Sequence, residues 1–428
     1  MKKQQLIFTV LIIMGLSFLI WILFSGPPTP PTPPQGEDPK PLSLDSINIF
    51  IENSASIFGY TTTNSEYINV VNDLAQFGNI VSQTEAKFNY RLISGDNQGL
   101  TEYELSNDPN VLSSTLSPSG LKRPTSGNSD INGMFNLVLQ SVGENSISIL
   151  ISDGIYDIGV ESNPLAALET QGIGTRTTFI NNLKEKNTET LVIKLSSDFE
   201  GEYYPGAKKG VESIKHKRPY YVWIFGDEQL VDTYFSDEKI QGLKGYQNHT
   251  AFKKLGETKV DYRNFSFGNS NVKVASRDPI SYEVVRAGES VVFSIATNLD
   301  LIRLEETYLN DPSNYRISLG YNLDTCIRMN QYSDPAGKVA KDLKNFTFTP
   351  SHLIFVSSEK STLGPVEISL IPKLPNWIEE STMESDAPLN GDGDKTFGLS
   401  TLMNGINEAY LEVSNAKEIF KLTINIKD

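Results

Sequence analysis

INIFIENSASIFGY, residues 47–60, begins as a strand with two apolar faces and ends in an acid and two serines. Its three isoleucines alternate along one face, and Phe50 lies on the other, so the strand is expected to be buried on both sides. The carboxylate of Glu52 follows directly, and the hydroxyls of Ser54 and Ser56 come next at alternate positions. An apolar strand that ends in oxygen ligands predicts a functional site at the edge of a sheet.

The chain around this strand alternates between strand and helix patterns up to about Asp237. Parallel sheets covered by helices produce this alternation, because each strand is buried on both faces. The pattern predicts a mostly parallel α/β sheet with helices on both faces. The expected strands are 47–52, 87–93, 101–106, 146–152, 190–196 and 219–226, the second and third paired as a hairpin; the expected helices are 65–81, 130–142, 163–171, 177–186 and 227–237.

The pattern changes near Lys244. From there on, β-branched and aromatic runs are separated by Gly, Asn, Asp and Pro, which predicts a β-rich half built of one or two sandwich-like modules. Even the last run, 408–426, is expected to be strand. The sequence therefore predicts an α/β domain at 44–240 that folds alone and β-rich domain(s) at 241–428. NGDGDKT, 390–396, lacks the rest of a calcium-binding loop and is predicted to be a solvated turn.

The N-terminus predicts a membrane anchor. Residues 6–24 are nineteen uncharged residues, about the length that crosses a bilayer as a helix. The alternative is a cleaved signal peptide, whose apolar region is normally shorter. Two lysines in the tip, residues 1–5, place that tip in the cytoplasm and the body of the protein outside the cell membrane. The proline-rich residues 25–43 favour an extended, semi-rigid stalk.

The composition excludes several classes of protein. A formal net charge of −15 argues against general nucleic-acid binding, which needs a basic surface. The single cysteine, Cys326, excludes an intramolecular disulfide. A large external region without disulfides favours a bacterial envelope over a eukaryotic surface. The three histidines lie far apart in the sequence, so a histidine-rich zinc site is not expected.

Two further loops bring oxygen atoms to the edge where Glu52 is expected. In open parallel sheets, ligands bind at the carboxyl ends of the strands. Ser129 lies in the loop that enters the helix predicted at 130–142, and Asp153 follows the strand at 146–152. Carboxylates, hydroxyls and water suit a hard cation, so Mg²⁺ is expected here, with Mn²⁺ or Ca²⁺ as alternatives.

This constellation resembles the metal ion-dependent adhesion site of von Willebrand factor A (vWA) domains. That family has Asp-x-Ser-x-Ser after its first strand, a Thr before a later helix and an Asp-Gly after its fourth strand. Here ENSAS contains Glu52, Ser54 and Ser56 at the first motif, Ser129 matches the Thr, and Asp153 with its following glycine matches the third. ENSASIFGY is also similar to the matching turn of bacterial membrane-anchored vWA proteins. The resemblance covers roughly residues 46–237.

The resemblance implies a binding protein that uses Glu52, Ser54, Ser56, Ser129 and Asp153 to hold a cation, with one coordination position open for a protein partner's carboxylate. Two residues depart from the family pattern. Glu52 replaces Asp, which moves the carboxylate by about 1.5 Å, and Ser129 replaces Thr. Mg²⁺ demands near-ideal octahedral geometry, so the longer acid weakens the site or acts through a water molecule.

Three readings of these residues stay open at this point. The first is the membrane-anchored adhesion protein just described, which is not an enzyme. The second is a metal-silent structural subunit of a cell-envelope assembly, in which the serines cap helices and loops and the acids bond to backbone N–H groups. The third is an envelope hydrolase, which needs a base such as His216 beside a serine, or Glu52 and Asp153 acting as a carboxylate pair.

Overall fold

A computed structural model of the chain describes residues 43–428, apart from 81–85, 97–98, 106, 117–128, 159–162, 204–211, 256–258, 303, 305, 334–336, 344–345 and 386–392. The predicted anchor, residues 6–24, and nearly all of the predicted stalk lie outside the described residues. Within the described part of the chain, no helix has the length and apolar character needed to cross a membrane. The described residues from Leu44 onward form one compact unit.

The largest sheet has seven strands in the order β3-β2-β1-β4-β6-β5-β7. Strand β1 pairs in parallel with β2 and β4, and the remaining neighbours are antiparallel. The strands are β1 (Ser46–Glu52), β2 (Lys87–Asp96), β3 (Gly99–Glu104), β4 (Ser146–Ser152), β5 (Thr188–Tyr203), β6 (Glu212–Asp227) and β7 (Tyr246–Phe252).

This sheet is mixed, and the prediction of a mostly parallel sheet holds only for its centre. The two longest strands, β5 and β6, follow one another in the chain and pair antiparallel along their whole length. Strand β6 thereby lies between β4 and β5, where a fully parallel arrangement would have placed β5 next to β4. The predicted hairpin of β2 and β3 is confirmed.

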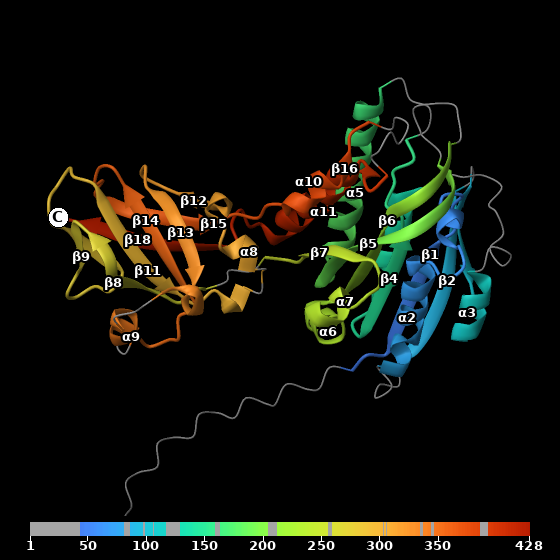
Figure 1. Cartoon of the computed structure of the whole chain (residues 1–428), viewed down its shortest axis with the longest axis horizontal. Helices are drawn as coiled ribbons and strands as arrows, with labels where there is room; N and C mark the ends of the chain where they lie inside the picture. Colours follow the sequence, from blue (N-terminus) through green and yellow to red (C-terminus); the bar gives the residue numbers. More distant parts are fainter. Residues whose placement is uncertain are drawn as a thin grey trace, which may run out of the picture. The chain divides into compact units, whose positions relative to one another are not determined.

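Helices cover both faces of the seven-stranded sheet (Figure 1), as the alternating pattern predicts. On the face of β1 that carries Ile47, Ile49 and Ile51, the apolar core is completed by the first group of helices. Phe50, on the opposite face, packs into a second core. The first group is α2 (Glu66–Ile80), α3 (Pro109–Thr115), α6 (Glu228–Tyr234) and α7 (Asp237–Gln241); the second is α4 (Ile131–Gln140), α5 (Pro164–Leu183) and α11 (Leu399–Ser414).

The β-rich half is a single sandwich. A five-stranded sheet, β12-β15-β18-β10-β9, and a four-stranded sheet, β13-β14-β11-β8, contribute to one apolar core. The strands are β8 (Tyr262–Ser270), β9 (Val272–Val274), β10 (Ser281–Val284), β11 (Val291–Thr297), β12 (Tyr315–Ile317), β13 (Asn322–Arg328), β14 (His352–Ser358), β15 (Gly364–Leu370) and β18 (Phe420–Lys427). The connections contain α8 (Glu306–Leu309), α9 (Lys338–Leu343) and the short 3-10 helices Asp300–Ile302, Pro312–Asn314 and Met329–Gln331.

The two halves do not divide at residue 240. Strand β7 belongs to the seven-stranded sheet, although it lies beyond the predicted boundary. After β15 the chain returns to that sheet through α10 (Asn376–Glu380), β16 (Thr382–Met383), β17 (Thr396–Phe397) and α11, and only then forms β18, inside the sandwich sheet. The α/β core is therefore completed by residues from the C-terminal part of the chain.

Helix α11 replaces a predicted strand at the start of the run 408–426. Its buried residues recur at helical spacing: Leu399, Leu402, Met403, Ile406 and Tyr410. Gly405 allows α11 to approach α5 closely, because a Cβ at this position would lie 2.8 Å from the carbonyl oxygen of Gly172. Only the second part of the run, Phe420–Lys427, is a strand.

Candidate functional site at the carboxyl edge of the central strands

Glu52 and Asp153 are brought to the same edge of the sheet by the parallel pairing of β1 and β4. The register pairs Ile51 with Ile151, so Glu52 lies level with Ser152 and one residue before the level of Asp153. Both strands end here, and the backbone leaves the sheet through the turn that carries Ser54. The parallel register therefore brings both acids to one edge of the sheet, as the sequence predicts.

The three predicted serines lie among these acids. The hydroxyl of Ser129 donates to Oε1 of Glu52 at 2.6 Å, across 77 residues of sequence. The Oγ atoms of Ser54 and Ser56 are 2.9 Å apart. The Ser54 hydroxyl lowers the pKa of Glu52 and the Ser56 hydroxyl lowers the pKa of Asp153, so both favour the ionised carboxylates. All five predicted residues thus belong to one cluster, named here the rim site.

The two carboxylates are buried, which makes their charge costly. Glu52 is 1 % exposed and Asp153 is 2 % exposed. Burial, followed by the charge of Asp153, raises the pKa of Glu52 to about 7. Burial also raises the pKa of Asp153, although the Ser56 hydroxyl and the positive charge of Arg218 oppose that rise. At neutral pH Glu52 is therefore only partly ionised, and the pair carries fewer than two full negative charges.

One oxygen of the rim site has no hydrogen-bond partner. Oε2 of Glu52 is fully buried and unpaired, whereas Oε1 accepts from Ser129. A buried polar atom without a partner costs about 1–3 kcal/mol, and more when it is charged. A cation bound by this oxygen would remove that cost. No group of three or more His, Cys, Asp or Glu able to hold a metal occurs in the described part of the chain, so any ion here would rest on two carboxylates and on hydroxyls.

The serines do not serve as helix caps, which is the structural alternative for them. Helix α4 is capped by Asp130, whose Oδ1 accepts from the N–H of Gly133 at 2.9 Å, and Ser129 is left to face Glu52. Ser56 occupies the cap position of the 3-10 helix Ile57–Tyr60 but makes no capping hydrogen bond. Asp153 does fit the alternative in one respect, because its Oδ1 accepts from the N–H of Ile155 at 3.2 Å.

Two residues of the site escaped the sequence analysis. The hydroxyl of Ser152, the last residue of β4, lowers the pKa of Glu52 and accepts from the N–H of Gly154 at 2.9 Å. Arg218, on β6, is 2 % exposed, its charge acts on Asp153, and its Nη1 has no hydrogen-bond partner. Its guanidinium lies 4.7 Å from the ring centroid of Tyr203. Ser152 lies at the end of the strand predicted at 146–152, whereas nothing in the sequence near Arg218 pointed to β4.

Gly154 fixes the direction of Asp153, and its replacement is expected to disturb the site. Its φ is +68°, which favours glycine, and a Cβ would lie 2.9 Å from Cδ2 of Tyr221. We expect Gly154→Ala to lower the free energy of unfolding by about 1–3 kcal/mol in urea titrations. Gly288→Ala is the matched control, because Gly288 has φ +79° but no atom within 4 Å of a Cβ. Equal losses in the two variants would mean that contact with Tyr221 does not matter.

The histidines that a hydrolase would need have other partners. The ring of His216 lies against Gly393, and its Nδ1 is 2.8 Å from the carbonyl oxygen of Lys217. Nδ1 of His249 is 2.7 Å from the hydroxyl of Tyr246 on β7. His352 lies in the sandwich, 3.2 Å from Glu306. None of these contacts is with a serine of the rim site.

Comparison of the sequence with protein families and with curated proteins found no match. No protein-family model matches the sequence, and no curated protein matches it significantly. The resemblance to vWA domains therefore rests on the sequence motifs that contain the rim-site residues.

Proposed function

We propose that this protein is a membrane-anchored binding protein whose vWA-like α/β half holds a divalent cation, Mg²⁺ in the first place, at the rim site. A protein partner would then complete the coordination of the ion with a carboxylate. The anchor would be residues 6–24, with the body outside the cell membrane. The carboxylates and hydroxyls of the rim site suit ligand binding, and the hydrogen bonds recorded for the three histidines go to residues outside the rim site.

The observation that carries this proposal is the convergence of hydroxyls on two buried acids, one of which has an unpaired oxygen. Ser129 reaches Glu52 from a different loop, at 2.6 Å, and Oε2 of Glu52 has no partner. Glu52 and Asp153 would supply the negative charge that a cation needs, and the serine hydroxyls would supply neutral oxygen ligands. A bound Mg²⁺ would compensate the charge of both acids and polarise a partner's carboxylate.

The arrangement of the strands supports the vWA-like reading. A parallel centre of β2, β1 and β4 is flanked by the antiparallel edge strand β3 and covered by helices on both faces. The rim site lies where β1 and β4 end, as the family's site does. The long β5–β6 hairpin departs from a regular parallel sheet and limits the resemblance to the half of the sheet that carries the site.

Arg218 favours a second candidate function, a metal-silent scaffold of an envelope assembly. Its buried guanidinium already acts on Asp153 as a positive charge, which is what a cation would provide. In this alternative the positive charge of Arg218 compensates the negative charge of the rim site. The α/β half then serves as a rigid subunit. The two candidates differ in one measurable property, which is the response of the protein to divalent cations.

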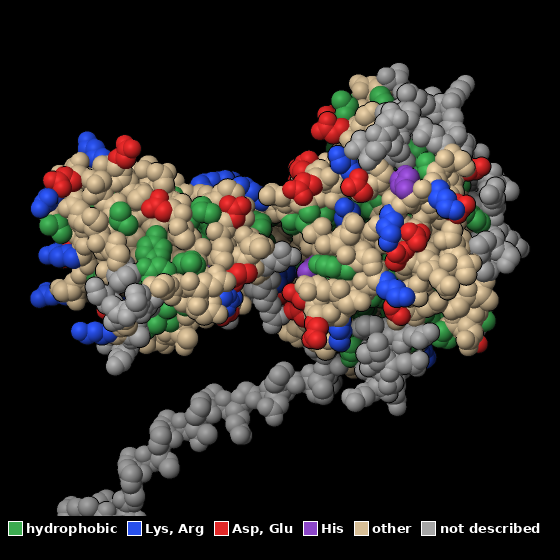
Figure 2. Space-filling view, in the orientation of Figure 1, with side chains coloured by type: hydrophobic (Ala, Val, Ile, Leu, Met, Phe, Trp, Pro, Cys, Tyr) green, Lys and Arg blue, Asp and Glu red, His purple; other side chains and the backbone are tan. Residues whose placement is uncertain are grey.

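The surface charges agree with a protein partner rather than a nucleic acid. Acidic and basic side chains are mixed on the face shown in Figure 2, and the net charge of the chain is −15. Binding to nucleic acid relies on neutralising phosphates with a basic surface. We therefore propose no nucleic-acid partner.

A metal-dependent melting experiment tests the proposal. Residues 44–428 are expected to melt higher in millimolar Mg²⁺ than in chelator, because a ligand at about 100 times its Kd stabilises the folded state by about 2.7 kcal/mol. Asp153→Asn keeps the size of the side chain and removes its charge, so this variant should not respond. An unchanged melting temperature of the wild type in Mg²⁺ and in Mn²⁺ would leave the metal-silent scaffold as the function.

A further inference from the structure

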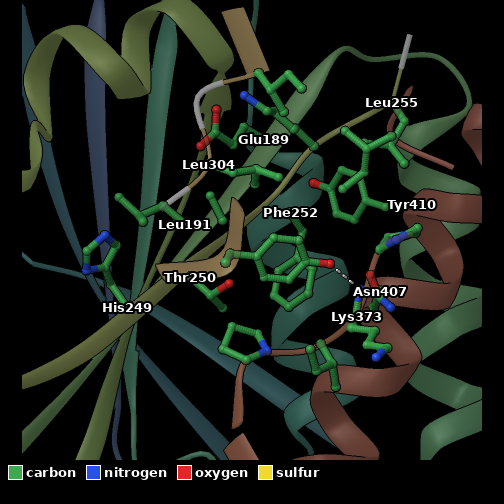
Figure 3. Close-up of a pocket in the computed structure, with 18 of the residues that line it drawn as sticks. Glu189, Leu191, His249, Thr250, Phe252, Leu255, Leu304, Lys373, Asn407 and Tyr410 are labelled. Carbon is green, nitrogen blue, oxygen red and sulfur yellow. Dashed lines mark hydrogen bonds between the residues drawn. The ribbon is translucent and has the colours of Figure 1, made fainter. Parts of the chain in front are cut away.

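The two acids of the rim site are closed off in this structure. Only 1 % of Glu52 and 2 % of Asp153 is exposed. The pocket of about 1120 Å³ in Figure 3 lies along β7, and none of the residues that line it belongs to the rim site. A partner's carboxylate therefore cannot reach the two acids in this conformation, and a covering segment has to move before the partner binds.

One covering segment is the outer part of the β5–β6 hairpin, residues 197–203 and 212–218, named here the outer hairpin. Strands β5 and β6 stay paired through these residues, past the point where β4 ends. Gly201 lies so close to the 3-10 helix after Ser56 that a Cβ on Gly201 would be 2.7 Å from Cα of Gly59. The outer hairpin thus packs on the turn that follows the first rim-site residues.

Arg218, at the inner end of the outer hairpin, brings a positive charge to the acids. Its Cζ lies 4.7 Å from the ring centroid of Tyr203 and 5.6 Å from that of Phe199, both on the outer hairpin. Burial raises the pKa of Asp153, and the charge of Arg218 opposes that rise. Nη1 of Arg218 is buried without a hydrogen-bond partner. Because a guanidinium stays ionised at every working pH, Arg218 is a permanent cation beside the rim site.

The charges of the site disfavour two cations at once. With both acids ionised, Glu52, Asp153 and Arg218 together carry one net negative charge. A divalent ion added beside a retained Arg218 would turn this into one net positive charge, whereas the same ion with the two acids alone would leave none. Like charges repel strongly at short distance away from water, and an uncompensated buried charge is costly. The ion and the guanidinium therefore compete for the same acids.

We propose that Arg218 is a tethered cation that keeps the rim site closed and that a divalent ion displaces. This inference rests on the proposed function, because it describes how the proposed ion binds. When the ion takes its place at Asp153, the guanidinium leaves, and the outer hairpin that carries it moves away from the 3-10 helix. This movement uncovers the coordination position that a partner's carboxylate fills. Arg218 thus sets the affinity for the ion and couples ion binding to the opening of the site.

Titration of Mn²⁺ into residues 44–428, followed by electron paramagnetic resonance, compares the wild type with Arg218→Gln. The variant should bind Mn²⁺ at least tenfold more tightly, because the ion no longer has to displace a positive charge. Lys215→Gln is the matched control, since Lys215 lies on the same strand with 76 % of its side chain exposed. It removes one positive charge from the solvent side and should change the affinity less than twofold. If Arg218 had only a structural role, its replacement would weaken binding instead.

Hydrogen exchange of the wild type measures the opening of the site and needs no variant. Mn²⁺ at saturation should speed exchange of the outer-hairpin amides at least fivefold, because the hairpin leaves the 3-10 helix on which it packs. Amides of β1 and β4, in the centre of the sheet, should not exchange faster.

The outcomes separate this inference from the proposed function. Equal or weaker binding by Arg218→Gln, or unchanged exchange of the outer hairpin in a wild type that binds Mn²⁺, would overturn the tethered cation and leave the cation site standing. Binding by Arg218→Gln but not by the wild type would support the competition and contradict the proposed function. Absence of binding in both proteins would overturn both.

Discussion

Residues 44–240, expressed alone, are expected not to fold cooperatively, because the fragment lacks β7, α10 and α11. Helix α11 buries seven residues against the α/β core, including Leu402, Met403, Ile406 and Tyr410. Burial of each large apolar side chain contributes about 1.5–3 kcal/mol, so these four contribute roughly 6–12 kcal/mol. A typical domain is stable by only about 5–15 kcal/mol. The loss of α11 therefore removes most of the stability of the α/β half.

Near-ultraviolet circular dichroism and urea unfolding of the fragment, beside residues 44–428, check this expectation. Within the longer chain, Ile406→Ala should cost about 2–5 kcal/mol, because the fully buried side chain leaves a cavity. Asn404→Ala, on the exposed side of the same helix, should change the free energy of unfolding by less than about 0.5 kcal/mol. A sharp unfolding transition and native-like near-ultraviolet signal in 44–240 would show that the fragment is an independent domain.

Glu52→Gln is expected to stabilise the metal-free protein at pH 8 but not at pH 5. The pKa of Glu52 is raised from 4.5 to about 7 by burial and by Asp153, so the folded state keeps a proton that the unfolded state has released. The stability that this proton provides is fully present below pH 4.5 and is lost as the pH rises through 7. The loss amounts to about 3 kcal/mol. Gln is neutral at every pH and still accepts the hydrogen bond of Ser129.

Urea unfolding in chelator between pH 5 and pH 8 measures this difference. The stability of Glu52→Gln relative to the wild type should rise by about 2–3 kcal/mol across that range. Asp73→Asn controls for the removal of one acid, because Asp73 lies on the exposed side of α2. Parallel pH profiles for Glu52→Gln and the wild type would mean that Glu52 ionises normally in the folded protein.

The fold and the rim site were predictable from sequence where a short stretch determines the outcome. Strand β1 is apolar on both faces, and Glu52 marks its end, so the parallel centre and the edge that carries the site followed from local pattern. Asp153 followed for the same reason, because Asp-Gly ends the apolar strand β4. Ser129 was predicted from the position of its loop and from the resemblance, and its 2.6 Å hydrogen bond to Glu52 depends on a contact across the fold.

The features that were missed depend on pairing between distant residues. The pattern of β6 is that of any buried strand, and only its pairing with β4 brings Arg218 beside Asp153. Helix α11 had a helical pattern of its own, but it stood in a β-rich region, and a short apolar run there was read as strand. Its partner, α5, lies more than 200 residues earlier, so no local sequence pattern indicates that the two helices touch.

Titration of Mn²⁺ into residues 44–428, with free Mn²⁺ counted by electron paramagnetic resonance, tests the cation site most directly. The proposal predicts about one bound ion per chain in the wild type and no specific binding in Asp153→Asn. It also predicts tighter binding in Glu52→Asp, because the shorter acid restores the ligand position that the resemblance implies. Absence of binding in both the wild type and Glu52→Asp, or equal binding in all three proteins, would contradict the rim site as a metal site.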